Sequence, residues 1–260
     1  MKFTFPLALT FLTTIPWPRL GMAGPQELAR SMFWFPWVGA LLGAIYWGAW
    51  WALGKILPAP AAAALLVALT ALLTGGLHLD GLADTADGLG GGTSPAARLE
   101  IMKDSRLGAF GGVALILALL LKFAFLLSWA EKGLGGGVLL LFPVISRWGM
   151  ALMAYISPYA RREGGLGEAM TVWLTPKVMA GATLSALVLA FPAWGIAGLI
   201  LLAGAGAMVW LMSLYFRKAL GGVTGDVLGA ANEVLEVLVL GGGLLLASGT
   251  SGVSAFRFFW

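Results

Sequence analysis

Long apolar runs separated by short polar segments dominate this chain of 260 residues. Several of the runs are long enough to cross about 30 Å of hydrocarbon as helices. We predict seven spanning helices, near residues 33–54, 59–77, 107–129, 138–156, 178–192, 196–216 and 234–248. The fifth and sixth come from one apolar run that the turn-forming sequence FPAWG, residues 191–195, divides in two. The pattern therefore predicts an all-α, polytopic integral membrane protein, with residues 1–260 as a single membrane-embedded domain.

Short helices at the membrane interface are expected as well. The segment MKFTFPLALTFLTTIPWP, residues 1–18, has the apolar run of a signal peptide but lacks the small-residue cleavage pattern. We therefore expect it to be a retained helix that lies at the interface or inserts halfway.

Composition supports the membrane class and excludes several kinds of chemistry. Hydrophobic residues make up 60% of the chain and charged residues 11%, against about 25% charged in ordinary soluble domains. Cysteine is absent, which excludes disulfides and thiolate metal sites. The net charge of +4 is spread over short loops, so membrane lipid is the expected partner and nucleic acid is not. The oligomeric state stays open, a homo-oligomer included.

The distribution of basic residues predicts the orientation. Of the sixteen Lys and Arg residues, eleven fall on one side of the predicted membrane and three on the other, while Lys122 and Arg147 fall inside spans. Because Lys and Arg are enriched on the cytoplasmic side, the loops at 78–106, 157–177 and 217–233 should be cytoplasmic, together with the N-terminus. These loops contain nearly all the acids, so we expect an active site on the cytoplasmic side of the cell inner membrane.

The densest acidic segment is TGGLHLDGLADTADGLGGG, residues 74–92. A helix over 77–89 would place Asp80, Asp84 and Asp87 at positions i, i+4 and i+7, on one stripe about 60° wide. Neighbouring carboxylates repel one another, and Mg²⁺ prefers oxygen ligands of this kind, usually with substrate phosphates. We therefore predict Asp80, Asp84 and Asp87 as metal ligands, with Asp104 completing the set. The alternative is an acidic face paired with loop arginines and no metal.

Other polar groups in or near the predicted cytoplasmic loops suit phosphate or nucleoside binding. The segment YARREGGLGEAM, residues 159–170, sets two arginines before a glycine-rich turn, as a diphosphate clamp would. The predicted substrate-binding residues are Arg106, Arg147, Arg161, Arg162, Thr224, Asp226, Asn232 and Glu233. Arg147 lies inside a span, where a cation needs an acidic or phosphate partner.

His78, the only histidine, falls opposite the aspartate stripe on a helical wheel. We expect it to be a neutral, hydrogen-bonded histidine at the membrane edge. One histidine and no cysteine leave few options for a nucleophilic triad, and none is evident.

Three motifs resemble one family. TGGLHLDGLADTADG, RLEIMKDSRLGAFGG and GGVTGDVLGAANE occur in this order and are separated by spans. This arrangement resembles the adenosylcobinamide-GDP ribazoletransferases, also called cobalamin-5′-phosphate synthases. The early LTTIPWP and FPWVGALLG are similar to that family too, so the resemblance covers nearly the whole chain.

The resemblance implies a late step of cobalamin biosynthesis, in which adenosylcobinamide-GDP is joined to α-ribazole or its 5′-phosphate and GMP leaves. It also implies Mg²⁺ as cofactor. Under this hypothesis Asp84, Asp87 and Asp104 are the catalytic residues, and Asp84 or Asp87 takes the proton of the ribose 3′-hydroxyl. Asp226, together with Asn232 and Glu233, would bind a second metal ion or the nucleoside.

Two alternatives come from other classes. The CDP-alcohol phosphotransferases carry a related aspartate signature, but DGLAD has aspartate where that signature has arginine. A cation-coupled transporter would need acids near the middle of the membrane, whereas the acids here gather in loops on one predicted side.

Overall fold

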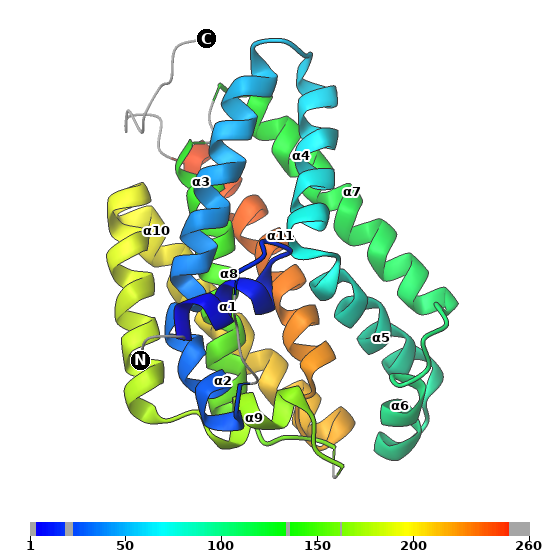
Figure 1. The fold of residues 1–260 in the computed structure, drawn as a ribbon. Coiled ribbons are helices and arrows are strands. Elements are labelled where there is room, and N and C mark those ends of the chain that lie inside the picture. Colours follow the sequence, from blue (N-terminus) through cyan, green and yellow to red (C-terminus); the bar gives the residue numbers. More distant parts are fainter. Residues whose placement is uncertain (1–3, 19–22, 134–135, 162, 250–260) are drawn as a thin grey trace.

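The computed structural model describes residues 4–18, 23–133, 136–161 and 163–249. In this part of the chain the regular structure is helical, with no strand, which confirms the predicted all-α class (Figure 1). The helices are α1 (Thr4–Leu12), α2 (Pro25–Ser31), the 3₁₀ turn η1 (Met32–Trp34), α3 (Phe35–Gly54), α4 (Ala59–Thr74), α5 (Leu77–Gly91), α6 (Pro95–Ile101), α7 (Ala109–Glu131), α8 (Gly136–Ile156), α9 (Leu166–Val172), α10 (Pro176–Leu220) and α11 (Gly225–Gly249).

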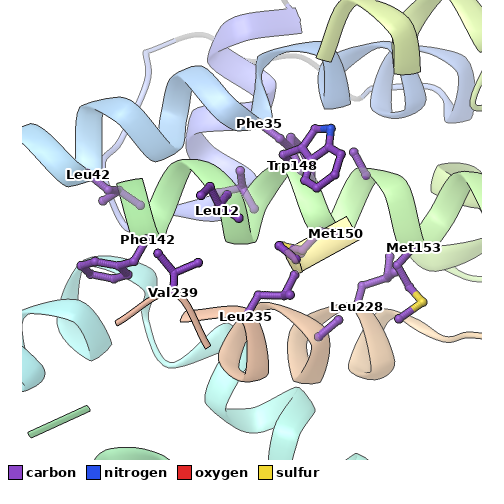
Figure 2. Close-up of a cluster of buried hydrophobic side chains, with 14 of the residues drawn as sticks. Leu12, Phe35, Leu42, Phe142, Trp148, Met150, Met153, Leu228, Leu235 and Val239 are labelled. Atoms are coloured by element: carbon purple, nitrogen blue, oxygen red, sulfur yellow. The ribbon is translucent and has the colours of Figure 1, made fainter. Parts of the chain in front are cut away.

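Helix α8 is the centre of the bundle. In its most apolar window 83% of the residues are buried, against 22% in the window of α7. Helices α3, α10 and α11 pack around α8. Figure 2 shows α8 between α3 and α11, with Phe142, Trp148 and Met150 among the buried side chains at these contacts. A polytopic membrane protein is expected to have such a buried central helix, surrounded by helices whose outer faces meet lipid.

Close approach between α3 and α8 depends on two glycines. A Cβ atom built on Gly39 would lie 2.3 Å from the carbonyl oxygen of Pro143, and one on Gly43 would lie 2.7 Å from that of Leu140. Glycines four residues apart let helix backbones approach closely, which is a common way to pack helices in membranes.

Five helices in the described ranges are long and apolar enough to cross a membrane: α3 together with α2, α7, α8, α10 and α11. A sixth span arises if α4 and α5, which are bent by 90° relative to each other, are counted as one. The bend lies at Gly75 and Gly76, whose φ angles of 61° and 71° are in the left-handed region. The predicted total of seven spans stays a prediction.

The long helix α10 contains the predicted turn. Trp194 and Gly195 have non-helical backbone angles. A Cβ atom on Gly198 would lie 2.5 Å from the carbonyl oxygen of Ala190, whereas residues eight apart in a straight helix are separated by about 12 Å along its axis. The two halves therefore fold back on each other, and the predicted segments 178–192 and 196–216 form the two arms.

The predicted N-terminal helix is present as α1, and the last span is longer than expected. A second short helix, α6, has Ser94 as its N-cap, whose hydroxyl accepts a hydrogen bond from the Ala97 amide at 3.2 Å. Helix α11 begins at Gly225, nine residues before the predicted start at 234. The predicted loop 217–233 thus contains the first turns of a long helix.

Replacing Gly39 by alanine should destabilise the protein, because the new methyl group would overlap the backbone of α8. Gly48→Ala on the same helix is the matched control, since a Cβ there meets no atom within 4 Å, and alanine favours helix by up to about 1 kcal/mol over glycine. Thermal unfolding in detergent, followed by circular dichroism, should show a lower midpoint for Gly39→Ala only. Equal midpoints would contradict the close approach of α3 and α8.

Candidate active site

The site is built where α5 crosses α11. A Cβ atom on Gly81 would lie 2.7 Å from the carbonyl oxygen of Asp226, and one on Gly229 would lie 3.3 Å from Cα of His78. Without side chains at these two glycines, the backbones of the helices nearly touch. The crossing brings the aspartates of α5 next to the first turn of α11, and these two segments are far apart in the sequence.

The predicted helix under the acidic motif is confirmed as α5, with Asp80, Asp84 and Asp87 on successive turns. Asp80 is exposed and Asp84 is half-buried. The charges of Asp80, Asp87 and Asp226 act on the Asp84 carboxylate together with that of Arg161. Within the described residues, neither Asp80 nor Asp84 has a hydrogen-bond or ion-pair partner. Two carboxylates are therefore free to bind a ligand at this crossing.

Asp226 is held by a cation from another loop. Nη2 of Arg161 lies 2.7 Å from Oδ2 of Asp226, and the Thr224 hydroxyl donates to the same oxygen at 3.2 Å. The loop that carries Arg161 is fixed by backbone pairing, in which the amide of Ala160 donates to the carbonyl of Val223 at 2.9 Å. The structure thus brings predicted residues from three segments to one place.

Asp87 has a structural partner. Its two carboxylate oxygens accept hydrogen bonds from the backbone amides of Gly108 and Gly111, both at 2.8 Å. These amides belong to the N-terminus of α7, where backbone N–H groups lack helical partners. Asp87 therefore caps α7 and fixes it to α5.

Asp104 and Arg106 form an exposed ion pair with each other, with 2.5 Å between Oδ2 and Nη2. The hydrogen bond from the Arg106 side chain, followed by one from its backbone amide, lowers the pKa of Asp104 to about 2. The structure does not join Asp104 to the α5 carboxylates by any hydrogen bond or ion pair in the described ranges. Arg162 lies outside the described residues.

Three other predicted residues belong to a buried ion cluster inside the bundle. Nζ of Lys122, on α7, lies 2.6 Å from Glu233 and 2.5 Å from Glu236, both on α11. Arg147 of α8 pairs with Glu236, and Asn232 donates to Glu236 at 3.1 Å. All five residues are at most 4% exposed. Arg147 therefore has the acidic partner that its position in a span requires.

The ion cluster contains a residue that sequence reasoning missed. Glu236 stands three residues after Glu233 and contacts both buried cations. The sequence did offer a signal for Glu236. Lys122 and Arg147 lie inside predicted spans, and each buried cation needs an anion nearby. The substrate-binding role of Arg147, Asn232 and Glu233 stays a prediction.

The expectation for His78 is wrong in one respect. The ring is 1% exposed, and neither nitrogen has a hydrogen-bond partner among the described residues. His78 lies on the α5 face that packs against Gly229 of α11. It is a buried residue without the expected hydrogen bond, and its place at the membrane edge stays a prediction.

The comparisons with known proteins agree with the motifs. Residues 4–244 match the family model described as cobalamin-5-phosphate synthase. The chain belongs to this family. The predicted family is therefore confirmed, as is the prediction of an enzyme, and both alternative classes are disfavoured.

Several curated relatives are named adenosylcobinamide-GDP ribazoletransferase. The protein from Syntrophobacter fumaroxidans is 46% identical over 241 residues, which are 91% of this chain and 96% of that protein. The protein from Pseudomonas entomophila is 44% identical over 92% of this chain and 97% of its own. The one from Roseiflexus sp. is 39% identical over 90% and 86%. No solved structure matches significantly.

Asp84 and Asp87 should respond differently to the same change. In Asp87→Asn an NH₂ group replaces one carboxylate oxygen, so one backbone N–H group of α7 loses its hydrogen-bond acceptor. Loss of a helix cap usually costs about 0.5–2 kcal/mol of stability. Asp84→Asn removes no protein contact and relieves repulsion from the neighbouring carboxylates, so its stability should be at least that of the wild type. Chemical unfolding in detergent measures both free energies, and a stable Asp87→Asn protein would contradict the capping role.

Glu236→Gln should destabilise the bundle strongly, because two buried cations would then share one carboxylate. Breaking a buried ion pair typically costs about 3–5 kcal/mol. The control is Glu131→Gln, an exposed carboxylate at the end of α7. Unfolding temperatures of the two variants in the same detergent test this, and similar values would show that the cluster is not needed for stability.

Proposed function

We propose that this chain is an adenosylcobinamide-GDP ribazoletransferase, which joins adenosylcobinamide-GDP to α-ribazole or α-ribazole 5′-phosphate and releases GMP. The product would be adenosylcobalamin or its 5′-phosphate. The supporting observation is the pair of partnerless carboxylates, Asp80 and Asp84, beside the Arg161–Asp226 ion pair. It occurs in a chain whose relatives carry that name over most of their length.

The donor set at this site fits Mg²⁺. In the described part of the chain no three acidic or histidine side chains meet to hold a metal ion by themselves. Mg²⁺ does not require this, because it is usually held by one or two carboxylates together with substrate phosphates and water. Asp80 and Asp84 would hold the ion, while Asp87 and Asp104 already have partners. Bound there, the ion would neutralise charge on the diphosphate during phosphoryl transfer.

The proposed reaction exchanges a phosphoanhydride bond for a phosphate ester bond. The ribose 3′-hydroxyl oxygen of the acceptor bonds to the phosphorus attached to cobinamide. The bond from this phosphorus to the bridging oxygen breaks, and GMP leaves with the electron pair. The hydroxyl proton passes to a carboxylate. Asp84 suits this role better than Asp87, since both oxygens of Asp87 accept backbone hydrogen bonds.

Arg161 is the cation best placed to bind the diphosphate. Its Nη2 atom pairs with Asp226, while its Nε has no hydrogen-bond partner in the described structure. A guanidinium group with a free donor binds phosphate oxygens well. Thr224 and Asp226 would keep this arginine pointed toward the α5 carboxylates. Arg106, by contrast, lies on the exposed loop with Asp104.

We place the enzyme in the cell inner membrane with this site on the cytoplasmic side. The apolar helices make it a multi-pass membrane protein. The orientation is supported by the Lys and Arg bias of the sequence. Figure 1 shows α5, α6, α9 and the beginning of α11 at the same end of the bundle, so the predicted cytoplasmic loops gather together.

Purified protein in liposomes should release GMP from adenosylcobinamide-GDP only when both α-ribazole and Mg²⁺ are present, and EDTA should stop the release. Asp84→Asn should lower turnover about 100-fold or more, the usual contribution of a general base. Glu131→Gln, far from the acids of α5, should keep wild-type turnover. Normal GMP release by folded Asp84→Asn protein would contradict the proposed role of Asp84, and release without acceptor would contradict the transferase.

A further inference from the structure

A cavity of about 700 Å³ lies beside the proposed active site. Its walls come from the end of α1, the turn between α4 and α5, and the beginning of α7. The volume is within the range of about 300–1,000 Å³ that is usual for small-molecule sites. The proposed function gives this cavity no role so far.

The cavity wall is uncharged except at one point. Apolar side chains such as Phe11, Ala83 and Leu115 line it, and among its described lining residues Asp80 alone carries a charge. The Thr10 and Thr13 hydroxyls donate to backbone carbonyls at 3.0 and 2.7 Å. These hydroxyls therefore offer lone pairs and no free proton.

The lining favours an uncharged group over a phosphate. No cationic side chain is among the described lining residues, and an anion in the cavity would lie near the like charge of Asp80. Arg161, the cation proposed for the diphosphate, pairs with Asp226 and is not among the lining residues. The diphosphate therefore belongs near Arg161, and the cavity suits an uncharged, largely apolar group with hydroxyls at one end.

Asp80 connects the cavity to the reacting groups. It lines the cavity and stands one helical turn before Asp84, so the two carboxylates project from the same face of α5. A molecule in the cavity would thus present its polar end to the partnerless acids. Of the proposed substrates, only the acceptor has a flat aromatic base and a ribose without a diphosphate; the single phosphate of α-ribazole 5′-phosphate would lie outside the cavity.

We propose that this cavity binds the acceptor nucleoside, with the aromatic base between α1 and α7 and the ribose hydroxyls at Asp80. This assignment rests on the proposed function and adds to it the place of the acceptor. Asp80 would then contact the acceptor, and Asp84 would be within one helical turn of the attacking hydroxyl.

The test fills the cavity from α7. Leu115→Trp places a large ring in the cavity, whereas Ile116→Trp adds the same ring at the neighbouring position, whose side chain is 59% exposed and does not line it. The KM for α-ribazole should rise at least ten-fold in Leu115→Trp and stay unchanged in Ile116→Trp. The KM for adenosylcobinamide-GDP should be unchanged in both variants.

A binding measurement separates this proposal from the proposed reaction. Equilibrium dialysis of α-ribazole against Asp84→Asn protein measures binding without turnover. Adding Leu115→Trp to this variant should weaken binding at least ten-fold, and adding Ile116→Trp should not. If Leu115→Trp protein elutes as aggregate, Thr10→Leu fills the cavity from the opposite wall and replaces it.

The outcomes are distinct. Wild-type protein that binds α-ribazole but never releases GMP would overturn the proposed function. GMP release by the wild type, with equal α-ribazole affinity in the two tryptophan variants, would overturn the cavity assignment alone. A lipid chain would then be the alternative occupant of the cavity.

Discussion

Two cations and two carboxylates neutralise one another inside a largely apolar bundle, and their pairing constrains how its helices pack. Lys122 and Arg147 come from different helices, and both contact Glu236. Moving a charge out of water is costly unless it is paired, so α7, α8 and α11 must keep this alignment. The beginnings of α7 and α11 then have fixed positions, and these are the ends that meet α5.

The active-site carboxylates contrast with this cluster. Inside the bundle every carboxylate has a cation, while Asp80 and Asp84 have no partner in the described structure and lie where α5 crosses α11. Unpaired acids close to one another repel, so this arrangement favours a ligand that brings positive charge. Asp87, bound to the amides of α7, fixes the helix that carries the other two.

Glycine permits two close helix contacts. Gly39 lets α3 lie against α8, and Gly81 lets α5 lie against α11. At Gly75 and Gly76 the left-handed backbone turns the chain by 90° into α5. The acidic helix therefore leaves the direction of α4 and reaches the end of the bundle where the loops gather.

The sequence by itself determined the membrane class, the apolar segments, the turn at 191–195 and the aspartate stripe, because each is a local pattern of hydrophobicity or helical period. Its motifs also identified the family. Only the tertiary structure decided the partners. Arg147 and Glu236 are 89 residues apart, and helical periodicity says which face a residue occupies but not which helix faces it. The helix crossings also leave Asp80 and Asp84 without a partner in the described structure, while Glu233 pairs with Lys122 inside the bundle.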